Sequence, residues 1–371
     1  MFRYRDYIPL STLADDDNES SHGKARNTHG KRRRIVQVAV LLSVALNLYL
    51  FWSWYATWPL PLDNYQALRT GCSARNTHPI VDTSALSNVP PANRHDHAVV
   101  TGLYTDAFAT AVATLGHTLN VANSSASRIL YYIPDKISQR ALCIASVSGW
   151  EPVPIERIAP PFRGVHRHFL DQYSKLHLWT LDQRGFKAVV YVDADTLVRR
   201  NFDELFRLPW TFAAVPDVYA QRQGALVGYV SAFNAGVMAL RPDSALFRDM
   251  VAKIASARYP AEQAEQAFLN QYFGAEALRL PYAYNANLAI KKRTPALWRG
   301  LQEEMRIMHF TMAKPFLQGD YAEVPMDQLE KNAEKVARKK SAFREEIMEW
   351  LEAWKETRRT YGAKLMQCNA L

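Results

Sequence analysis

Cysteine is scarce in this sequence, which has three among its 371 residues: Cys72, Cys143 and Cys368. An odd number cannot pair completely, so at most one disulfide forms within the chain and none is required. No internal repeat is visible, which excludes a repeat architecture. Long apolar runs are also rare, because one stretch alone is long and uncharged enough to cross a membrane. Hydrophobic residues nevertheless make up 48% of the chain, which is normal for a packed core.

That apolar stretch runs from Ile35 to Tyr55 and contains no charged residue. It is long enough for a bilayer of roughly 30 Å hydrocarbon thickness, and tryptophans crowd its far end as in an interfacial aromatic belt. A cleaved signal peptide would begin its apolar run earlier and would end it in small residues. We therefore expect an uncleaved transmembrane anchor over residues 35–58.

The distribution of charge sets the expected orientation of this anchor. Basic residues precede it, including the run Lys31-Arg32-Arg33-Arg34, and few follow it directly. By the positive-inside rule, the N-terminus stays cytosolic and the chain beyond the anchor is lumenal. Residues 1–34 predict a disordered cytosolic tail, and residues 59–95 predict a stem without periodicity. On the lumenal side, Asn123-Ser124-Ser125 is the one glycosylation acceptor pattern.

The net charge of +9 raises the question of a nucleic-acid partner. Much of the excess lies before the anchor, however, and the later cluster Arg338-Lys339-Lys340 cannot be told from a solvated basic helix face. We therefore expect no nucleic acid among the partners, and a membrane contact through the single N-terminal span.

Beyond about His97, strand-like and helix-like patterns alternate along the chain. Apolar runs typical of buried strands are His97–Tyr104, Arg128–Pro134, Glu151–Ile158 and a run that begins at Ala188. Helical spacing occupies the segments that end at Leu119, Ala145 and Gln183. This alternation predicts an α/β fold of parallel βαβ units with helices on both faces. Ligands of such sheets collect beyond the carboxyl ends of the strands.

One of these strands ends in two carboxylates, in the stretch "VVYVDADTLV" where Asp193 and Asp195 lie two positions apart. On an extended chain, that spacing puts both side chains on one face. Two carboxylates so close repel unless a positive group lies between them, and hard divalent cations suit carboxylate oxygens. A strand-end turn in which aspartate caps the next element explains the pair equally well.

The surrounding segment, Tyr173–Phe206, resembles the retaining glycosyltransferases of the glycogenin-like family, family 8 in the usual scheme. Further blocks follow in that family's order. They are "FNAGVMAL" (Phe233–Leu240), "EQAFLNQYF" (Glu265–Phe273), "LPYAYN" (Leu280–Asn285) and "IMHFTMAKPF" (Ile307–Phe316). The resemblance runs from about His97 to Phe316. Asp-x-Asp alone is a weak signal, whereas five ordered blocks are not explained by chance.

The resemblance implies a glycosyltransferase A fold over residues 96–320, with a single Rossmann-like domain and a mostly parallel sheet, preceded by one transmembrane helix. It also implies a UDP-sugar donor, a Mn²⁺ cofactor and transfer of a hexose to a glycan acceptor. Glucose, galactose and N-acetylglucosamine are all open as the sugar. With an anchor and a stem, the chain is most similar to fungal-type Golgi members of the family, so we expect a Golgi membrane protein with a lumenal catalytic domain.

Site residues follow from the resemblance block by block. The expected metal ligands are Asp193, Asp195 and His309, whose imidazole suits Mn²⁺ better than Mg²⁺. The expected donor contacts are Lys175, Asp193, Ala194, Asp195, Asn234, Ala235, Gly236 and Lys314. Gly236 would let the backbone approach the sugar, and Lys314 would meet the diphosphate as a point charge. The candidate catalytic residues are Gln266, Glu265 and Lys314.

The resemblance also bears on mechanism. The family retains anomeric configuration, which implies front-face attack with the leaving phosphate oxygen taking the acceptor's proton. Gln266 would then stabilise the intermediate ion pair. Glu265 is one methylene longer than the family's usual aspartate, which bears on sugar preference. No tyrosine lies between Asn285 and His309, so self-glucosylation at the site that glycogenins use is excluded.

Two other functions fit parts of the sequence. Nucleotidyl transfer also uses acidic pairs, but "TGLYTDAFATA" after the first strand has one glycine and no lysine, where those enzymes carry a glycine-rich basic loop. A catalytically inactive membrane-anchored scaffold would bind a partner through residues 321–371, whose apolar residues have helical spacing. That region is expected to pack on the domain or to form an oligomer. The scaffold function predicts decay of the metal triad, which is intact.

Overall fold

The computed structural model describes residues 28–56, 91–218, 232–274 and 276–371. The first 27 residues of the predicted tail, residues 59–90 of the predicted stem and Cys72 lie outside the described residues. The chain divides into two units, Met1–Trp58 and Pro59–Leu371.

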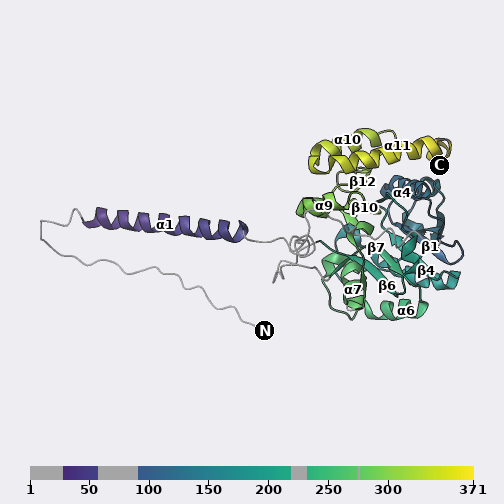
Figure 1. Ribbon diagram of the computed structural model, residues 1–371, viewed down its shortest axis with the longest axis horizontal. Helices are drawn as coiled ribbons and strands as arrows, with labels where there is room; N and C mark the ends of the chain where they lie inside the picture. The colour runs from purple at the N-terminus through teal and green to yellow at the C-terminus, as the bar shows by residue number, and fades with distance from the viewer. Residues whose placement is uncertain (1–27, 57–90, 219–231, 275) are drawn as a thin grey trace. The chain divides into compact units, whose positions relative to one another are not determined.

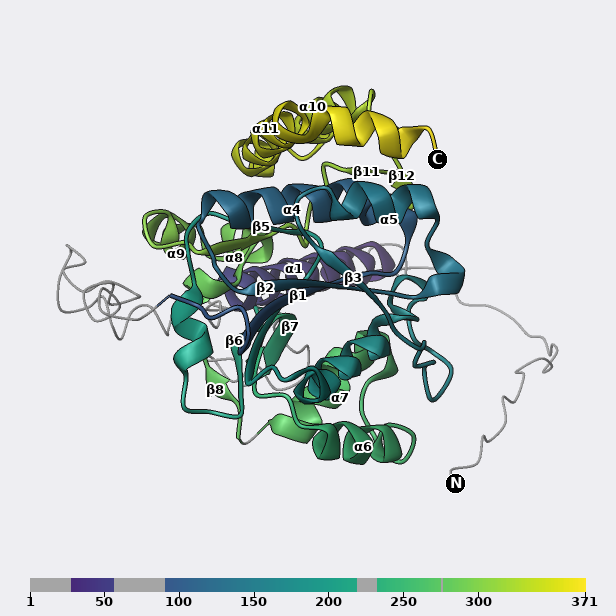
Figure 2. The ribbon, with the colours of Figure 1, turned by 90° about the vertical axis from the view of Figure 1, so that its right-hand side faces the viewer.

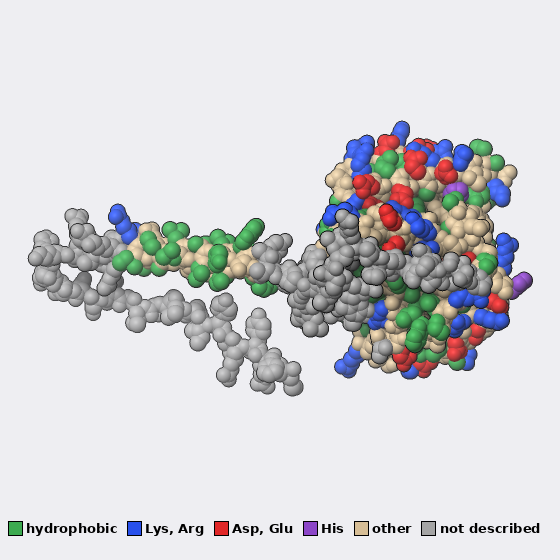
Figure 3. Space-filling view, in the orientation of Figure 1, with side chains coloured by type: hydrophobic (Ala, Val, Ile, Leu, Met, Phe, Trp, Pro, Cys, Tyr) green, Lys and Arg blue, Asp and Glu red, His purple; other side chains and the backbone are tan. Residues whose placement is uncertain are grey.

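Helix α1 (Thr28–Ala56) forms the described part of the first unit. Its segment Arg33–Trp54 is 22 residues long, apolar enough to cross a membrane and unburied. Hydrophobic side chains cover it in Figure 3, in contrast to the mixed charges on the second unit. The helix begins earlier than predicted, so residues 28–34 of the expected disordered tail are helical. Lysine and arginine are good helix formers, and they extend the apolar helix without a break.

A seven-stranded sheet of order β3-β2-β1-β4-β7-β6-β8 forms the centre of the second unit. Strands β3, β2, β1 and β4 run parallel to one another, whereas β7 is antiparallel to both β4 and β6. The strands are β1 (His97–Leu103), β2 (Ser127–Tyr132), β3 (Glu151–Pro154), β4 (Ala188–Val192), β6 (Phe212–Pro216), β7 (Phe233–Leu240) and β8 (Leu278–Arg279). The sheet is therefore mostly parallel, which confirms the predicted α/β class.

Helices cover both faces of this sheet (Figure 2). On one side lie α4, α5, α8 and α9, with α10 and α11 outside them, and on the other lie α6 and α7. The helices are α4 (Ala109–Val121), α5 (Gln139–Ser146), α6 (Ser244–Lys253), α7 (Ala264–Phe273), α8 (Leu288–Arg293), α9 (Pro295–Leu301), α10 (Leu329–Lys339) and α11 (Arg344–Asn369). Strand β1 is buried throughout, because Val99 and Leu103 join one apolar cluster while Ala98 and Val100 join the other.

Several predicted helices are 3₁₀ turns or are preceded by them. The segment predicted to be helical up to Gln183 is the 3₁₀ helix η4 (Gln172–Arg184), which ends at Gly185 in the left-handed conformation. Helix α5 begins at Gln139, directly after Ser138, whose hydroxyl accepts a hydrogen bond from the Ala141 amide and caps the helix. The other 3₁₀ turns are η1 (Asp106–Phe108), η2 (Pro134–Lys136), η3 (Arg167–Phe169), η5 (Asp203–Arg207), η6 (Ala261–Gln263), η7 (Tyr282–Tyr284) and η8 (Ser341–Phe343).

Two small sheets complete the second unit. In one, β10 (Ile307–His309) lies between β5 (Thr196–Val198) and β9 (Ala286–Asn287). Because β5 follows directly after Asp195 and His309 pairs with Thr196, this sheet brings the histidine beside the two aspartates. The other sheet is a hairpin of β11 (Leu317–Gln318) and β12 (Ala322–Glu323).

The C-terminal helices pack on the domain to which they belong (Figure 1). Trp350, Leu351 and Trp354 of α11 are buried and join the apolar cluster that also contains α4 and α5. A disulfide joins Cys143 of α5 to Cys368 of α11, with Cα atoms 5.4 Å apart. Of the two arrangements that the sequence left open for residues 321–371, the structure shows the intramolecular one.

Candidate active site

A cleft of about 630 Å³ lies at the edge of the sheet where the parallel strands end. It is lined by the segments that follow β1, β4 and β6 and by the start of the antiparallel strand β7. All eleven residues singled out from the sequence line it: Lys175, Asp193, Ala194, Asp195, Asn234, Ala235, Gly236, Glu265, Gln266, His309 and Lys314.

Asp193, Asp195 and His309 converge on one point of this cleft, with one ligand atom from each within 4.8 Å of the others. The His309 Nε2 atom lies 3.8 Å from Asp193 Oδ2 and 3.3 Å from Asp195 Oδ1. The donor set is therefore two carboxylate oxygens and one imidazole nitrogen. Oxygen ligands with one imidazole suit a divalent cation such as Mn²⁺.

In both Asp193 and Asp195, one carboxylate oxygen faces His309 and the other contacts a lysine. Asp193 Oδ1 accepts hydrogen bonds from the Tyr191 hydroxyl at 2.7 Å and pairs with Lys175 Nζ at 2.9 Å. Asp195 Oδ2 accepts a hydrogen bond from Lys314. The remaining oxygens, Asp193 Oδ2 and Asp195 Oδ1, are the ones that face the imidazole. This arrangement orients one oxygen of each aspartate as a candidate ligand.

The ring of His309 is held from behind by two neighbours. Its Nδ1 lies 2.9 Å from Asn285 Oδ1, which leaves Nε2 directed at the aspartates. The neighbour on its other side is Gly236, where a Cβ atom would lie only 2.3 Å from the ring carbon Cε1 of His309. Gly236 lines the cleft as well, and the absence of a side chain at this position leaves room for the His309 ring.

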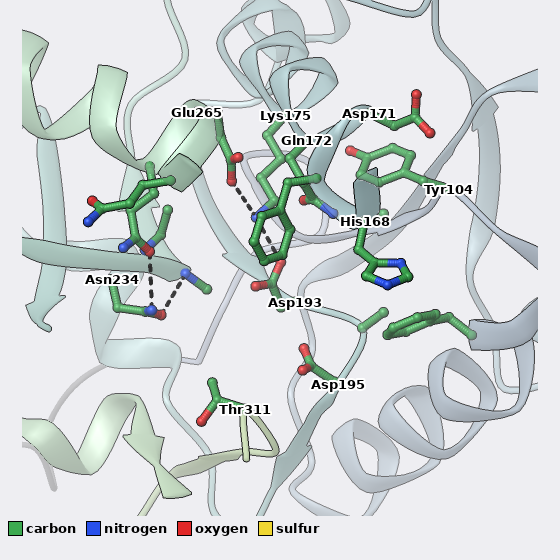
Figure 4. Close-up of a pocket in the computed structure, with 18 of the residues that line it drawn as sticks. Tyr104, His168, Asp171, Gln172, Lys175, Asp193, Asp195, Asn234, Glu265 and Thr311 are labelled. Atoms are coloured by element: carbon green, nitrogen blue, oxygen red, sulfur yellow. Dashed lines mark hydrogen bonds and ion pairs between the residues drawn. The ribbon is translucent and has the colours of Figure 1, made fainter. Parts of the chain in front are cut away.

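Lys175 is buried between two carboxylates, at 2.9 Å from both Asp193 Oδ1 and Glu265 Oε1 (dashed lines in Figure 4). Burial alone would lower the pKa of Lys175, but the two carboxylates outweigh burial and raise it. Burial also raises the pKa of Glu265, an effect that Lys175 partly offsets. The lysine therefore remains an ammonium that joins Asp193 to Glu265.

Lys314 contacts the second aspartate, Asp195. Besides its bond to Asp195, its Nζ donates a hydrogen bond to the Phe310 carbonyl at 3.1 Å. Burial alone would raise the pKa of Asp195, but Lys314 and His309 outweigh burial and hold that pKa well below its usual range. Asp195 therefore stays ionised, as a ligand for a cation must.

Gln266 is locked by a hydrogen-bond network. Its Oε1 accepts from Asn234 Nδ2 at 3.2 Å and from the Ala235 amide at 3.0 Å, and its Nε2 donates to Asp217 Oδ2 at 2.9 Å. Asn234 Oδ1 in turn accepts from Asn285 Nδ2 at 2.9 Å. One connected network thus reaches from Gln266 to His309 of the candidate metal site.

The cleft also contains residues that the sequence did not indicate: Gly102, Tyr104, Phe108, His168, Asp171, Gln172, Asp217, Asp320 and Tyr321. Tyr104 and Asp217 follow strands β1 and β6 at the same edge as Asp193, so the strand-end rule would have found them. The Tyr104 hydroxyl and Gln172 Oε1 are buried and have no hydrogen-bond partner among the described residues. Figure 4 shows both near Lys175, on the side of the cleft away from Thr311.

Together, these features define an α/β protein with a cleft suited to a divalent cation and an anionic ligand. Comparisons with known proteins show what the chain is similar to. Residues 163–318 match the family model described as Glycosyl transferase family 8. Over these residues the chain is similar to glycosyltransferase family 8, and glycogenins are among its relatives.

Individual relatives match part of the chain. It is 28% identical to glycogenin of Neurospora crassa over 58% of this chain and 31% of that protein. It is 29% identical to inositol phosphorylceramide glucuronosyltransferase 1 of Arabidopsis thaliana, over 47% of this chain and 30% of that protein. The match thus spans about a third of each relative's length. A solved structure of the galactosyltransferase LgtC with donor and acceptor sugar analogues is 19% identical, with a TM-score of 0.45, over 64% of this chain and 95% of that one.

Proposed function

We propose that this chain is a retaining, Mn²⁺-dependent glycosyltransferase that moves a hexose from a UDP-sugar to a glycan acceptor. The observation that supports it most directly is the convergence of Asp193, Asp195 and His309 in a cleft that also presents the buried Lys175 and the largely buried Lys314. A membrane-anchored inactive scaffold would have no need of this geometry.

Each side chain has a part in this proposal. A divalent cation held by the three ligands would act as a Lewis acid on the donor diphosphate. Lys314 lies at the same aspartate and would neutralise charge on the leaving phosphate. Lys175 holds Glu265 in place, where its carboxylate would orient the sugar hydroxyls. Gln266, whose amide is fixed by three hydrogen bonds, would present a rigid dipole near the transferred sugar.

UDP and the hexose come from the family resemblance. Glycogenins stand among the relatives, beside proteins named as glucuronosyltransferases. Glucose, galactose and N-acetylglucosamine are the donor sugars that we propose to test first, with UDP-glucuronate as the comparison.

We also propose that the enzyme is anchored in the Golgi membrane with its catalytic domain in the lumen. Helix α1 is long enough to span, and a Cys143–Cys368 disulfide fits an oxidising compartment. Asn123 of the acceptor pattern has an exposed side chain. Protease added to intact vesicles should spare the domain, and Asn123→Gln should lose a glycan. Digestion without detergent would overturn this orientation.

The full chain, purified in detergent, should release UDP from at least one UDP-sugar in the presence of Mn²⁺ and should stop when the metal is chelated. The panel is UDP-glucose, UDP-galactose, UDP-N-acetylglucosamine and UDP-glucuronate, with UDP release as the readout. No release from any donor, together with no Mn²⁺-dependent UDP binding by calorimetry, would favour the inactive scaffold instead.

A further inference from the structure

The turn between β11 and β12 has an unusual backbone at two of its three residues. Gly319 has φ of +50° and Tyr321 has φ of +60°. Glycine adopts this left-handed conformation readily, but for a bulky residue such as tyrosine it is strained. Strain of this kind persists only where surrounding contacts impose it, and it concentrates at functional sites. The contacts of Tyr321 therefore bear on what the turn does.

The ring of Tyr321 contacts three sides of the cleft. It stacks on the His168 ring, with centroids 4.0 Å apart and planes 17° apart, and it lies 6.3 Å from the Phe108 ring. Lys314 Nζ lies 5.9 Å from its centroid, within the range of a cation–π contact. All four side chains line the cleft.

The neighbouring residue ties the same turn to the segment before η4. Asp320 pairs with Arg167 and lies 3.1 Å from His168 Nε2. Two loops far apart in the sequence, Arg167–Phe169 and Gly319–Tyr321, are thereby joined across the mouth of the cleft. The Arg167 and Asp320 side chains are more than half exposed, so the stacked rings hold this contact more firmly than the ion pair does.

We propose that Tyr321 is a positioning residue that holds the ammonium of Lys314 at the aspartates, a role that rests on the proposed function. Lysine has a long flexible side chain, and without a wall it would exchange between the cleft and solvent. The Tyr321 ring supplies that wall for the ammonium that pairs with Asp195, and its π face favours the cation. The Tyr321 position lies beyond residues 163–318, so the family match does not include it.

A double-mutant cycle on the full chain tests whether Tyr321 acts through Lys314. The readout is turnover of the UDP-sugar that the parent uses best. Tyr321→Leu should lower kcat about 3- to 30-fold with a smaller change in KM, the range that a cation–π contact supports. In a Lys314→Ala background, the same substitution should have little further effect, because the group that it positions is gone.

Two variants separate positioning from folding. Tyr321→Phe keeps the ring and should retain kcat within about twofold. Tyr321→Gly relieves the left-handed backbone but removes the ring, so it should fold with a thermal midpoint near that of the parent and yet lose kcat as Tyr321→Leu does.

Parent-like kcat in Tyr321→Leu, or an equal fold-loss with and without Lys314, would overturn the positioning role while leaving the transferase intact. A parent chain that releases no UDP from any donor would overturn the proposed function, and this inference with it.

Discussion

The floor and the mouth of the cleft are held in different ways. The floor consists of Asp193, Asp195 and His309, which stand at the ends of β4 and β10, and the last two are less than 10% exposed. The mouth consists of two loops joined by an ion pair whose side chains are 66% and 59% exposed and by one stacked pair of rings. Strand register fixes the floor, whereas side-chain contacts join the two segments of the mouth.

This difference predicts where substitutions act. Removing one partner of a buried ion pair leaves a charge without compensation and is strongly destabilising, whereas an exposed pair contributes little. Changes to the floor should therefore affect metal binding, rate and stability together. Changes to the mouth should affect the reaction with little cost in stability.

The largest effect is expected for Asp195→Asn. It removes a ligand charge from the metal cluster, so UDP-sugar turnover with Mn²⁺ should fall by about 10³ or more. If the variant keeps activity within tenfold of the parent, the assignment of Asp195 as a metal ligand is wrong.

The same variant should show a second effect, on stability. Because the folded-state pKa of Asp195 lies below its unfolded value of about 3.9, the charged aspartate stabilises the parent at neutral pH, and this contribution is lost as pH falls below about 4. The Asn variant should be less stable near pH 7 and should lose less stability on acidification. Chemical denaturation at several pH values measures both.

The next largest effect is expected for Lys175→Met, which leaves the buried Glu265 and the partly buried Asp193 without their shared cation. The free energy of unfolding should fall by about 3 kcal/mol. A matched control is Lys253→Met, since Lys253 also has a carboxylate partner, Asp249 at 2.7 Å, but in an exposed helical pair. The control should change stability by less than about 0.5 kcal/mol. Equal losses in the two variants would contradict the difference between buried and exposed pairs.

Gly236→Ala should act on the metal through His309. A Cβ atom at this position must displace the imidazole, so affinity for Mn²⁺ in the presence of UDP should fall about 10- to 100-fold, as for the loss of a group that orients a ligand. Calorimetry measures this affinity. Gly362→Ala in α11 is the control, because its Cβ would meet no atom within 4 Å. Unchanged metal affinity in Gly236→Ala would mean that the ring is not held there.

The smallest effect is expected at the mouth. Asp320→Asn removes the exposed pair with Arg167 but keeps the stacked rings, so stability should change by less than about 1 kcal/mol. The denaturant concentration at the midpoint of unfolding should be nearly the same for the parent and for Asp320→Asn. A large destabilisation would show that the mouth is held as firmly as the floor.

The two regions also differ in how far the sequence predicts them. The spacing of Asp193 and Asp195 indicates a shared face because a strand has a period of two, and β4 confirms that they follow a strand. His309 came from the family resemblance, since its pairing with Thr196 is a long-range contact that no local pattern contains. Burial of Lys175 between two carboxylates is likewise a product of the tertiary fold.

The sequence alone does not indicate that the residues of the mouth lie close together. Arg167, His168, Asp320 and Tyr321 lie in segments without periodicity, and their meeting depends on where two loops are carried by the rest of the fold. Tyr104 and Asp217 were predictable in principle, because both follow strands that end at the edge of the sheet where the cleft lies.

Binding of UDP to the full chain in detergent, measured by calorimetry with and without Mn²⁺, tests the central claim most directly. Parent protein should bind UDP tightly only when Mn²⁺ is present, and Asp195→Asn should lose that dependence. UDP binding by the parent that is equal with and without Mn²⁺, or an Asp195→Asn variant that binds as the parent does, would contradict the assignment of Asp193, Asp195 and His309 as the metal site.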